Sequence, residues 1–385
     1  MSQQFDVCVR GDGVVGRSLA LLLANDRLKV ALVTSAAIAS PGEDVRAYAL
    51  NGGAKNLLEG LRAWPDAPFV TPVRAMQVWS GDTGQAAAAD SSSATPGAST
   101  RPSQLDFSAD SVAQAALAWI VDVPALEQQL AQAVRFQSRI ETVQAPVKAA
   151  LQVICEGQKS SSRNEFGASW SVKPYGQKAV AARLESDKPH QGVARQWFVR
   201  GEVLALLPLG GAAGNSLALV WSVSAERADA LQKLSSEEFC AALQADCGEM
   251  LGMLSLKSER GTWPLSLASA DRWVGPGWAL AGDAAHAVHP LAGQGLNLGL
   301  ADARALSEVI AQREYWRGLG DEKLLRRYER ARKADVMAIG AVTDGLHGLF
   351  AQTDARWQVL RDWGMKGVGR SGPLKSWLVR QATGL

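Results

Sequence analysis

Residues 282–299 read GDAAHAVHPLAGQGLNLG, and this stretch decides the fold. An apolar run, residues 278–281, leads into Asp283, and a proline turn and a glycine-rich bend then open a helix that continues through Asp302 and Ala305. A buried strand, a turn and a helix in this order bring a carboxylate and helix N–H groups to one edge of a sheet. The pattern indicates a nucleotide-binding site.

The residue types in this turn suit a flavin. Asp283, at the end of a buried strand, can accept hydrogen bonds from a polyol such as the ribityl chain, and Gly293 and Gly295 let the backbone approach a ligand. The helix that begins near Leu296 directs N–H groups and a partial positive charge at the electron-rich pyrimidine edge. The alternative is a strand, a turn and a helix whose glycines serve tight packing alone.

The amino end supplies the second half of the site. A short apolar strand, residues 5–9, is followed by GDGVVG at residues 11–16 and by an apolar helix. In this arrangement a pyrophosphate lies on the helix amino terminus, with Gly11 making the turn, Gly13 allowing close approach and Gly16 allowing helix–strand packing.

The acid that usually binds the ribose is missing. A second strand, residues 29–33, follows in the required order, but it ends at Thr34-Ser35, where a dinucleotide fold usually carries an acidic residue. Charge-assisted hydrogen bonds contribute roughly 1.5–3 kcal/mol, so this loss weakens binding by about one to two powers of ten. A ligand as large as FAD tolerates a loss of that size.

Further motifs carry a resemblance to a known family. They are DVRAYAL at 44–50, VW at 78–79, YGQ at 175–177, LLPL at 206–209, VWS at 220–222, YERARK at 328–333, TDGL at 343–346 and LF at 349–350. With the two glycine motifs they span nearly the whole chain. The chain resembles the ubiquinone-biosynthesis hydroxylases, a branch of the FAD-dependent aromatic monooxygenases similar to para-hydroxybenzoate hydroxylase.

The resemblance implies an α/β fold in which an FAD-binding Rossmann-like domain carries an inserted antiparallel β-sheet substrate domain and a C-terminal helical segment. It implies that NAD(P)H docks transiently and reduces FAD, and that O2 then serves to hydroxylate an electron-rich ring. The resemblance implies that the ADP part of FAD contacts Gly11, Gly13, Val14, Val15 and Gly16. It implies that Arg46 contacts the cofactor and that Asp283 binds the ribityl chain. It also implies that the isoalloxazine contacts Pro290, Gly293, Gln294, Gly295, Leu296 and Asn297.

Three positions, Thr34 among them, depart from the family pattern. The family carries an Asp-Gly motif before an Arg-containing turn, and the nearest match, CEGQKSSSR at 155–163, has Glu156 in place of Asp. Where the family usually has an Arg that helps to hold the FAD phosphates, Pro124 stands within VDVPAL at 121–126. All three positions lie on the nucleotide side of the cofactor, so we expect FAD binding to be weakened.

Three functions remain open at this point. The first is hydroxylation of a prenylated phenol in ubiquinone biosynthesis, with enzymes of a ubiquinone-biosynthesis complex as partners. The second is flavin-dependent hydroxylation of another aromatic compound, which only substrate-pocket residues would distinguish. The third is a non-catalytic paralogue that binds partner enzymes or a quinone precursor, which the altered nucleotide side allows.

The organisation follows from composition and strand pattern. We assign the FAD-binding domain to 1–72, 106–170 and 265–345, the substrate domain to 73–105 and 171–264, and a C-terminal helical segment to 346–385. Short alternating strands at 179–184, 196–199, 203–207 and 217–223 indicate an antiparallel sheet. The glycines at 210–214 form a hairpin loop between two strands, residues 84–104 form a flexible insertion, and the charged face of a helix at 322–338 faces solvent.

Composition sets bounds on the class of protein. The chain has 385 residues, 47% of them hydrophobic and 20% charged, which is ordinary for a two-domain globular protein. A net charge of +2 argues against a nucleic-acid partner, and the four cysteines lack a metal-binding or dense disulfide pattern, which indicates reduced thiols. Without an apolar run of about 18 residues or a basic leader, we expect a cytoplasmic protein.

The carboxyl end qualifies this expectation. Residues 363–385 contain Lys366, Arg370, Lys375 and Arg380 and no acid, interleaved with apolar residues. A basic amphipathic tail can lie on anionic lipid, which would suit a lipid-tailed substrate. The alternative is packing of this segment against the flavin domain.

Catalytic residues are not assigned by the sequence. His286 and His289 lie three residues apart beside a carboxylate, but no further acidic or cysteine ligand accompanies them, so we expect no metal. His289 either assists proton transfer or is a hydrogen-bonded structural residue. Candidate walls of an apolar ring pocket, for which core packing is the alternative explanation, are Trp79, Phe198, Trp221 and Trp263.

Overall fold

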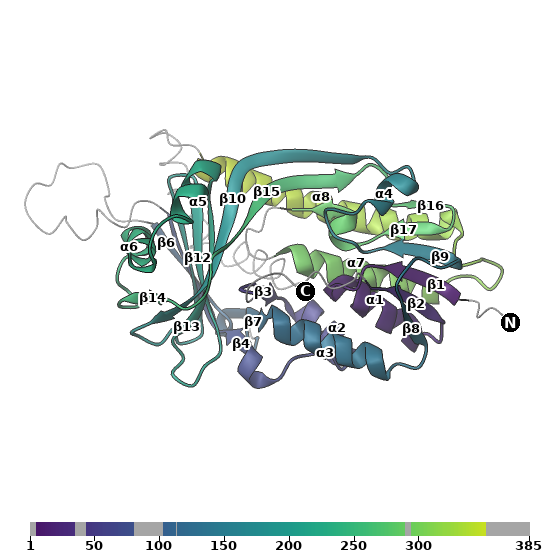
Figure 1. Cartoon of the computed structure of the whole chain (residues 1–385), viewed down its shortest axis with the longest axis horizontal. Coiled ribbons are helices and arrows are strands. Elements are labelled where there is room, and N and C mark those ends of the chain that lie inside the picture. The colour runs from purple at the N-terminus through teal and green to yellow at the C-terminus, as the bar shows by residue number, and fades with distance from the viewer. Residues whose placement is uncertain (1–4, 35–43, 81–102, 113, 289–293, 352–385) are drawn as a thin grey trace, which may run out of the picture.

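The computed structural model of the chain describes residues 5–34, 44–80, 103–112, 114–288 and 294–351. A mainly parallel sheet at one end and a mainly antiparallel sheet at the other form its two halves, and the long strands β10 and β15 run from one to the other (Figure 1). The expected α/β class is confirmed.

Six strands of the described residues form the mainly parallel sheet, in the order β16-β17-β9-β1-β2-β8. Their bounds are β1 Phe5–Arg10, β2 Val30–Val33, β8 Ile140–Val143, β9 Ala149–Ile154, β16 Val274–Gly275 and β17 Trp278–Leu280. β1 pairs in parallel with β2 on one side and with β9 on the other, with Val7 opposite both Val30 and Leu151. The central strand is therefore buried, as its run of apolar residues predicts.

Helices cover this sheet and join it to the rest of the chain (Figure 1). They are α1 Val14–Asn25, α2 Gly52–Gly60, α3 Val123–Phe136, α4 Ser162–Glu165, α7 Gln294–Ala311 and α8 Glu322–Ala351. In α1, Leu19 and Leu23 are four residues apart and fully buried, so one face of the helix packs on the sheet. A small antiparallel sheet, in the order β3-β7-β4, lies beside α3; its strands are β3 Ala47–Leu50, β4 Val70–Val73 and β7 Ala118–Asp122.

Nine strands of the described residues form the second large sheet, in the order β18-β15-β10-β13-β12-β11-β5-β6, with β14 paired to β10. Their bounds are β5 Ala75–Ser80, β6 Ser103–Ser108, β10 Trp170–Ser186, β11 Val193–Val199, β12 Glu202–Pro208, β13 Ser216–Ser224, β14 Leu254–Leu256, β15 Gly261–Ala270 and β18 His286–Ala287. Pro208 pairs with Leu217, so residues 210–214 form the expected hairpin loop.

The outer face of this sheet carries a separate core under α5 (Ala225–Leu231) and α6 (Ser236–Cys247). Trp79 stacks on Trp197 there, with ring centroids 4.9 Å apart, and Trp221 packs edge-on against Phe239. Trp79 and Trp221 are thus core residues and not pocket walls.

Two sequence-based assignments need correction. The charged helix extends to Ala351, and Arg332 on it is 6% exposed, so its charged face is not solvated throughout. Residues 84–102 of the expected flexible insertion, 84–104, lie outside the described residues. The last two residues of this segment, 103 and 104, begin β6. The domain boundaries remain a prediction, although β6 carries the antiparallel sheet on to Ser108 and α8 continues past residue 346.

Candidate functional site

The three glycines that follow β1 differ in how much space surrounds them. A Cβ on Gly11, whose φ is +104°, would lie 2.6 Å from the carbonyl oxygen of Cys155, and a Cβ on Gly16 would lie 1.9 Å from that of Gly11. Gly13 has no heavy atom within 4 Å of the corresponding position, and no side chain caps the start of α1. The loop therefore packs tightly at Gly11 and Gly16 and presents open backbone at Gly13.

The side chain of Val15 brings the two glycine motifs together. A Cβ on Gly282 would lie 3.2 Å from Cγ2 of Val15, and a Cβ on Gly299 would lie 2.7 Å from the same atom. Only glycine fits at residue 299 while Val15 keeps this position. Two segments far apart in sequence, the first turn of α1 and the segment that carries Gly282 and Gly299, thus meet at the carboxyl edge of the parallel sheet.

Asp283 lies in this shared edge, in a short 3-10 turn (η4, Gly282–Ala284) directly after β17. Burial raises the pKa of its carboxyl above the ordinary value. The hydrogen bond that it receives from Nε2 of Gln158 is long, at 3.4 Å. Asp283 is therefore a half-buried acceptor with capacity for a stronger donor, such as a hydroxyl group.

The first turn of α7 holds four of the predicted contact residues, Gln294, Gly295, Leu296 and Asn297, and Pro290 and Gly293 lie outside the described residues. The Asn297 side chain is fixed on the protein backbone, because Oδ1 accepts from the Asn51 backbone N–H at 3.0 Å and Nδ2 donates to the Ala49 carbonyl at 2.8 Å. Asn297 thus ties the start of α7 to β3 and α2.

Arg46 precedes β3 and is held by carboxylates. Its Nη2 lies 2.6 Å from Oδ2 of Asp44 and 3.5 Å from Oε1 of Glu127, and Nη1 lies 3.4 Å from the Tyr48 hydroxyl. Burial opposes ionisation of Asp44, but the hydrogen bonds from Arg46 outweigh it and lower the pKa of that carboxyl. The Asp44 side chain keeps the guanidinium in place and charged.

A buried ionic network lies directly behind Asp283. Asp302 on α7 is fully buried; it accepts from the Gly282 backbone N–H at 3.0 Å, from Nε2 of His286 at 2.6 Å and from Nε of Arg332 at 2.8 Å. Burial alone would raise the pKa of Asp302, but His286 and Arg332 lower it below its ordinary value. The network fixes the turn that carries Asp283 to α7 and α8.

The segment 155–163 supports the same turn from the other side. Glu156 accepts hydrogen bonds from the hydroxyls of Ser160 and Ser162, at 2.7 and 2.8 Å. Arg163 lies 3.8 Å from the ring centroid of Trp170 and donates to the carbonyl of Ala284 at 3.1 Å. Glu156, which departs from the family pattern, thus organises the loop that holds Arg163.

The other two altered positions lie where the sequence pattern places them. Thr34 follows β2, and its hydroxyl accepts from Nε2 of Gln144 at 3.2 Å. Pro124 lies in the first turn of α3, whose start is capped by Asp122. Neither residue contributes a charge to this edge of the sheet.

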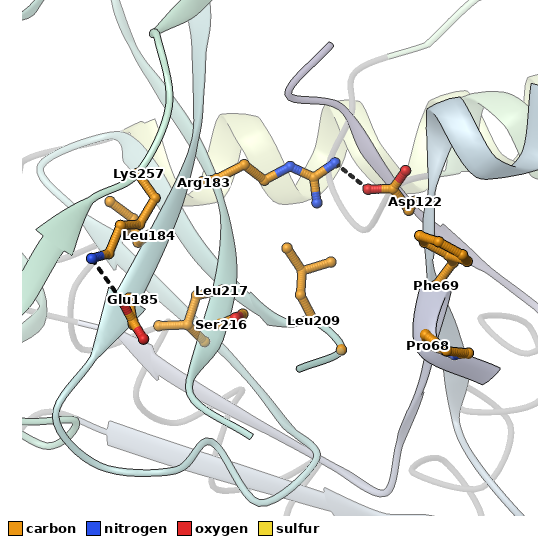
Figure 2. Close-up of a pocket in the computed structure, with 11 residues that line it drawn as sticks. Pro68, Phe69, Asp122, Arg183, Leu184, Glu185, Leu209, Ser216, Leu217 and Lys257 are labelled. Carbon is orange, nitrogen blue, oxygen red and sulfur yellow. Dashed lines mark hydrogen bonds and ion pairs between the residues drawn. The ribbon is translucent and has the colours of Figure 1, made fainter. Parts of the chain in front are cut away.

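A cavity of about 350 Å³ lies elsewhere, between the loop at Pro68 and Phe69 and the hairpin of β12 and β13 (Figure 2). Each cation that lines it is paired, Arg183 with Asp122 at 2.8 Å and Lys257 with Glu185 at 2.7 Å. None of the predicted cofactor residues lines this cavity. Arg183 also donates to the carbonyl of Arg46 at 2.8 Å, so it links the antiparallel sheet to the segment before β3.

Sequence reasoning missed the roles of Asp302 and Arg332. One signal was available: Asp302 stands on the apolar face of α7 between Leu298 and Leu306, and an acid in such a position needs a buried partner.

Among the described residues no group of three or more His, Cys, Asp or Glu could hold a metal, and no described helix is long and apolar enough to cross a membrane. His289 lies outside the described residues.

Comparison with known proteins agrees with this geometry. A family model described as "FAD binding domain" matches residues 4–342. Ubiquinone hydroxylase UbiL of Rhodospirillum rubrum is 36% identical over 62% of this chain and 55% of its own length, and the 3-demethoxyubiquinol 3-hydroxylase of Escherichia coli is 27% identical over 100% of both chains. The crystal structure of PqsL, a probable FAD-dependent monooxygenase from Pseudomonas aeruginosa, superposes with a TM-score of 0.75 at 20% identity, over 95% of this chain and 100% of PqsL, and so shares the fold.

The resemblance found in the sequence is thereby confirmed. Two glycine motifs, a half-buried carboxylate and an uncapped helix start meet at one sheet edge, and the family match covers that edge and both sheets. The chain belongs to the FAD binding domain family.

Proposed function

We propose that this chain is an FAD-dependent monooxygenase that uses NAD(P)H and O2 to hydroxylate an aromatic ring, and that its substrate is a prenylated phenol of ubiquinone biosynthesis. The observation that carries the proposal is the meeting of the loop before α1 and the turn of Asp283 at one sheet edge. The names of the relatives, which include two ubiquinone-pathway hydroxylases, support the substrate class.

The residues at this edge fit FAD. Gly13 leaves open backbone at an uncapped helix start, which suits a diphosphate, and Asp283 is a half-buried acceptor whose 3.4 Å hydrogen bond leaves room for a ribityl hydroxyl. We assign the ADP part to Gly11, Gly13, Val14, Val15 and Gly16, a further contact to Arg46, and the ribityl chain to Asp283. The isoalloxazine is assigned to Pro290, Gly293, Gln294, Gly295, Leu296 and Asn297.

Bound FAD supplies the redox chemistry, and the protein residues orient it and exclude water. Asp302, through the Gly282 backbone and His286, holds the turn of Asp283, and Arg163 holds the same turn through the Ala284 carbonyl. A carboxylate in this position binds hydroxyl groups and needs no proton transfer of its own. No side chain is assigned as a general base.

We assign the inner face of the antiparallel sheet to the substrate ring. Trp263 on β15 is half-buried, and it lies near Val45, because a Cβ on Gly261 would approach both side chains, at 2.9 and 3.3 Å. Val45 immediately precedes the predicted cofactor contact Arg46. Strand pairing places Phe198 on the same face as Trp263, but Phe198 packs with Val203 in a separate cluster, so Trp263 is the candidate that lies beside the predicted cofactor contact.

The test is product formation by the FAD-loaded protein with a prenylated phenol, NADH or NADPH, and isotopically labelled O2. The proposal predicts substrate-dependent NAD(P)H oxidation and a product that carries one labelled oxygen, detected by mass spectrometry. A hydroxylated product from unprenylated phenols alone would favour the second function, hydroxylation of another aromatic compound. Protein that binds FAD but oxidises NAD(P)H with none of these compounds would contradict the proposal.

We also propose two partners, for which the sequence is the support. The basic amphipathic tail, residues 363–385, contacts anionic membranes and so reaches a lipid-tailed substrate, and the chain works beside other enzymes of ubiquinone biosynthesis. Co-sedimentation with vesicles that contain anionic lipid, compared with neutral vesicles, tests the membrane contact. Equal binding to both kinds of vesicle, or to neither, would contradict it.

A further inference from the structure

Arg17 lies in the second turn of α1, and its side chain lies between the glycine loop and α3. Its Nη2 is 3.5 Å from Oδ2 of Asp12, and its Nη1 donates to the backbone carbonyl of Glu127 at 3.0 Å. The side chain is 20% exposed. The guanidinium is therefore held beside the loop and is not extended into solvent.

The start of α3 offers no cation of its own at this point. Pro124 has neither a charge nor a backbone N–H to offer a phosphate. Glu127 lies one turn further along α3 than Pro124, the position at which the family carries an arginine. Arg17 therefore contacts α3 one turn away from that position. Arg46 approaches the same residue, with Nη2 3.5 Å from Oε1 of Glu127. Two arginines from outside α3 therefore meet at its first turns.

The charges of the loop require a cation here. Asp12 stands between Gly11 and Gly13, so its carboxylate lies beside the backbone to which we assign the diphosphate. Two anionic groups that lie close together repel each other, and a cation beside them offsets this repulsion. The positive charge of Arg17 offsets the negative charge of Asp12. The contacts to Asp12 and Glu127 use two of the five N–H donors of the guanidinium.

We propose that Arg17 binds the diphosphate of FAD and replaces the arginine that the family carries at the position of Pro124. This inference rests on the proposed placement of FAD across the glycine loop. A planar guanidinium binds two phosphate oxygens at once, and it does so from α1 as well as from α3 provided that its stem is fixed. The contact to the Glu127 carbonyl supplies that fixation.

The test is the dissociation constant of FAD, measured by quenching of flavin fluorescence on the full chain. Arg17→Gln keeps a donor for the Glu127 carbonyl but removes the charge, and it should weaken FAD binding by about tenfold to about a hundredfold. Arg17→Lys keeps a point charge and should recover part of the loss. Arg304→Gln, which removes an arginine from an exposed ion pair on α7, is the matched control and should leave the constant unchanged.

A second background separates phosphate binding from simple neutralisation of Asp12. In Asp12→Asn protein, adding Arg17→Gln should still weaken FAD binding at least about tenfold. No further loss in that background would overturn the proposal, because Arg17 would then act only on Asp12.

Thermal melting without FAD controls for the fold. In one outcome, Arg17→Gln protein melts well below the wild type and yet binds FAD with wild-type affinity at a lower temperature at which it is folded. That pair of results would likewise overturn the proposal. Wild-type protein that binds no FAD at all would overturn the placement of FAD as well. Tight binding by the wild type with no effect of Arg17→Gln would overturn the role of Arg17 alone.

Discussion

Asp302→Asn is the most informative single substitution, because Asp302 joins three segments at one fully buried carboxylate. The wild-type oxygens accept from the Gly282 backbone, His286 and Arg332. Asparagine keeps the size but loses the charge, and it leaves the Arg332 guanidinium, whose side chain is 7% exposed, with the exposed Asp335 at 2.5 Å but without its buried counterion. Breaking a buried ion pair by removing one partner costs about 3–5 kcal/mol. Folded domains are stable by only about 5–15 kcal/mol, so a substantial part of the stability should be lost.

The assay is urea denaturation followed by the summed fluorescence of the 13 tryptophans, one of which, Trp273, stacks on His286 with centroids 4.9 Å apart. Glu308→Gln is the matched control on the same helix, since its ion pair with Arg304 is exposed and contributes at most about 0.5 kcal/mol. A loss below about 1 kcal/mol in Asp302→Asn would contradict this expectation, since it would mean that Asp335 or water compensates the charge of Arg332.

The dependence on pH has a definite sign. The pKa of Asp302 is lowered in the folded protein, so its contribution is fully present above the unfolded value of about 3.9 and is lost as the pH falls through the folded value. The stability difference between wild type and Asp302→Asn should therefore stay constant near neutral pH and shrink in acid. A difference that shrinks as the pH rises from neutral would contradict the assigned role of the carboxylate.

Further substitutions test the remaining parts of the site. Asp283→Ala should release FAD on gel filtration under conditions in which wild type retains it, because the carboxylate is assigned to the ribityl chain; unchanged flavin content would rule that assignment out. Thr34→Glu should tighten FAD binding by up to about one to two powers of ten, measured by fluorescence titration, and no change would mean that another group already holds the ribose. Gly16→Ala should fail to fold, since its Cβ would lie 1.9 Å from a carbonyl oxygen, whereas Gly13→Ala, with open space around it, should fold and lose FAD affinity. Circular dichroism and FAD titration separate these outcomes, and similar behaviour of the two alanine variants would contradict the distinct roles of the glycines.

The features that local sequence patterns determine could be predicted. The strand before Gly11, the helix after it and the hairpin loop at 210–214 follow from apolar runs and glycine positions, and the structure confirms them. The sharing of one site by the two glycine motifs was expected from their residue types, but no local pattern shows that Val15 packs against Gly299.

Long-range pairing explains what the sequence could not show. Arg332 stands in a helix with many charges, and only the approach of α7 makes it a buried partner of Asp302. Strand alternation likewise left open which face of a sheet an aromatic residue occupies, so Trp79 could not be distinguished from Trp263 as a pocket wall. Trp79 proved to stack on Trp197 in the outer core.

Retention of FAD tests the central claim most directly. The purified chain is mixed with FAD, separated from the excess on a desalting column, and examined by visible absorption spectroscopy. We expect the two absorption bands of oxidised flavin to remain with the protein and to bleach when NADH or NADPH is added without O2. A colourless protein that cannot be loaded would contradict the proposed activity and would favour a non-catalytic role as a partner-binding subunit.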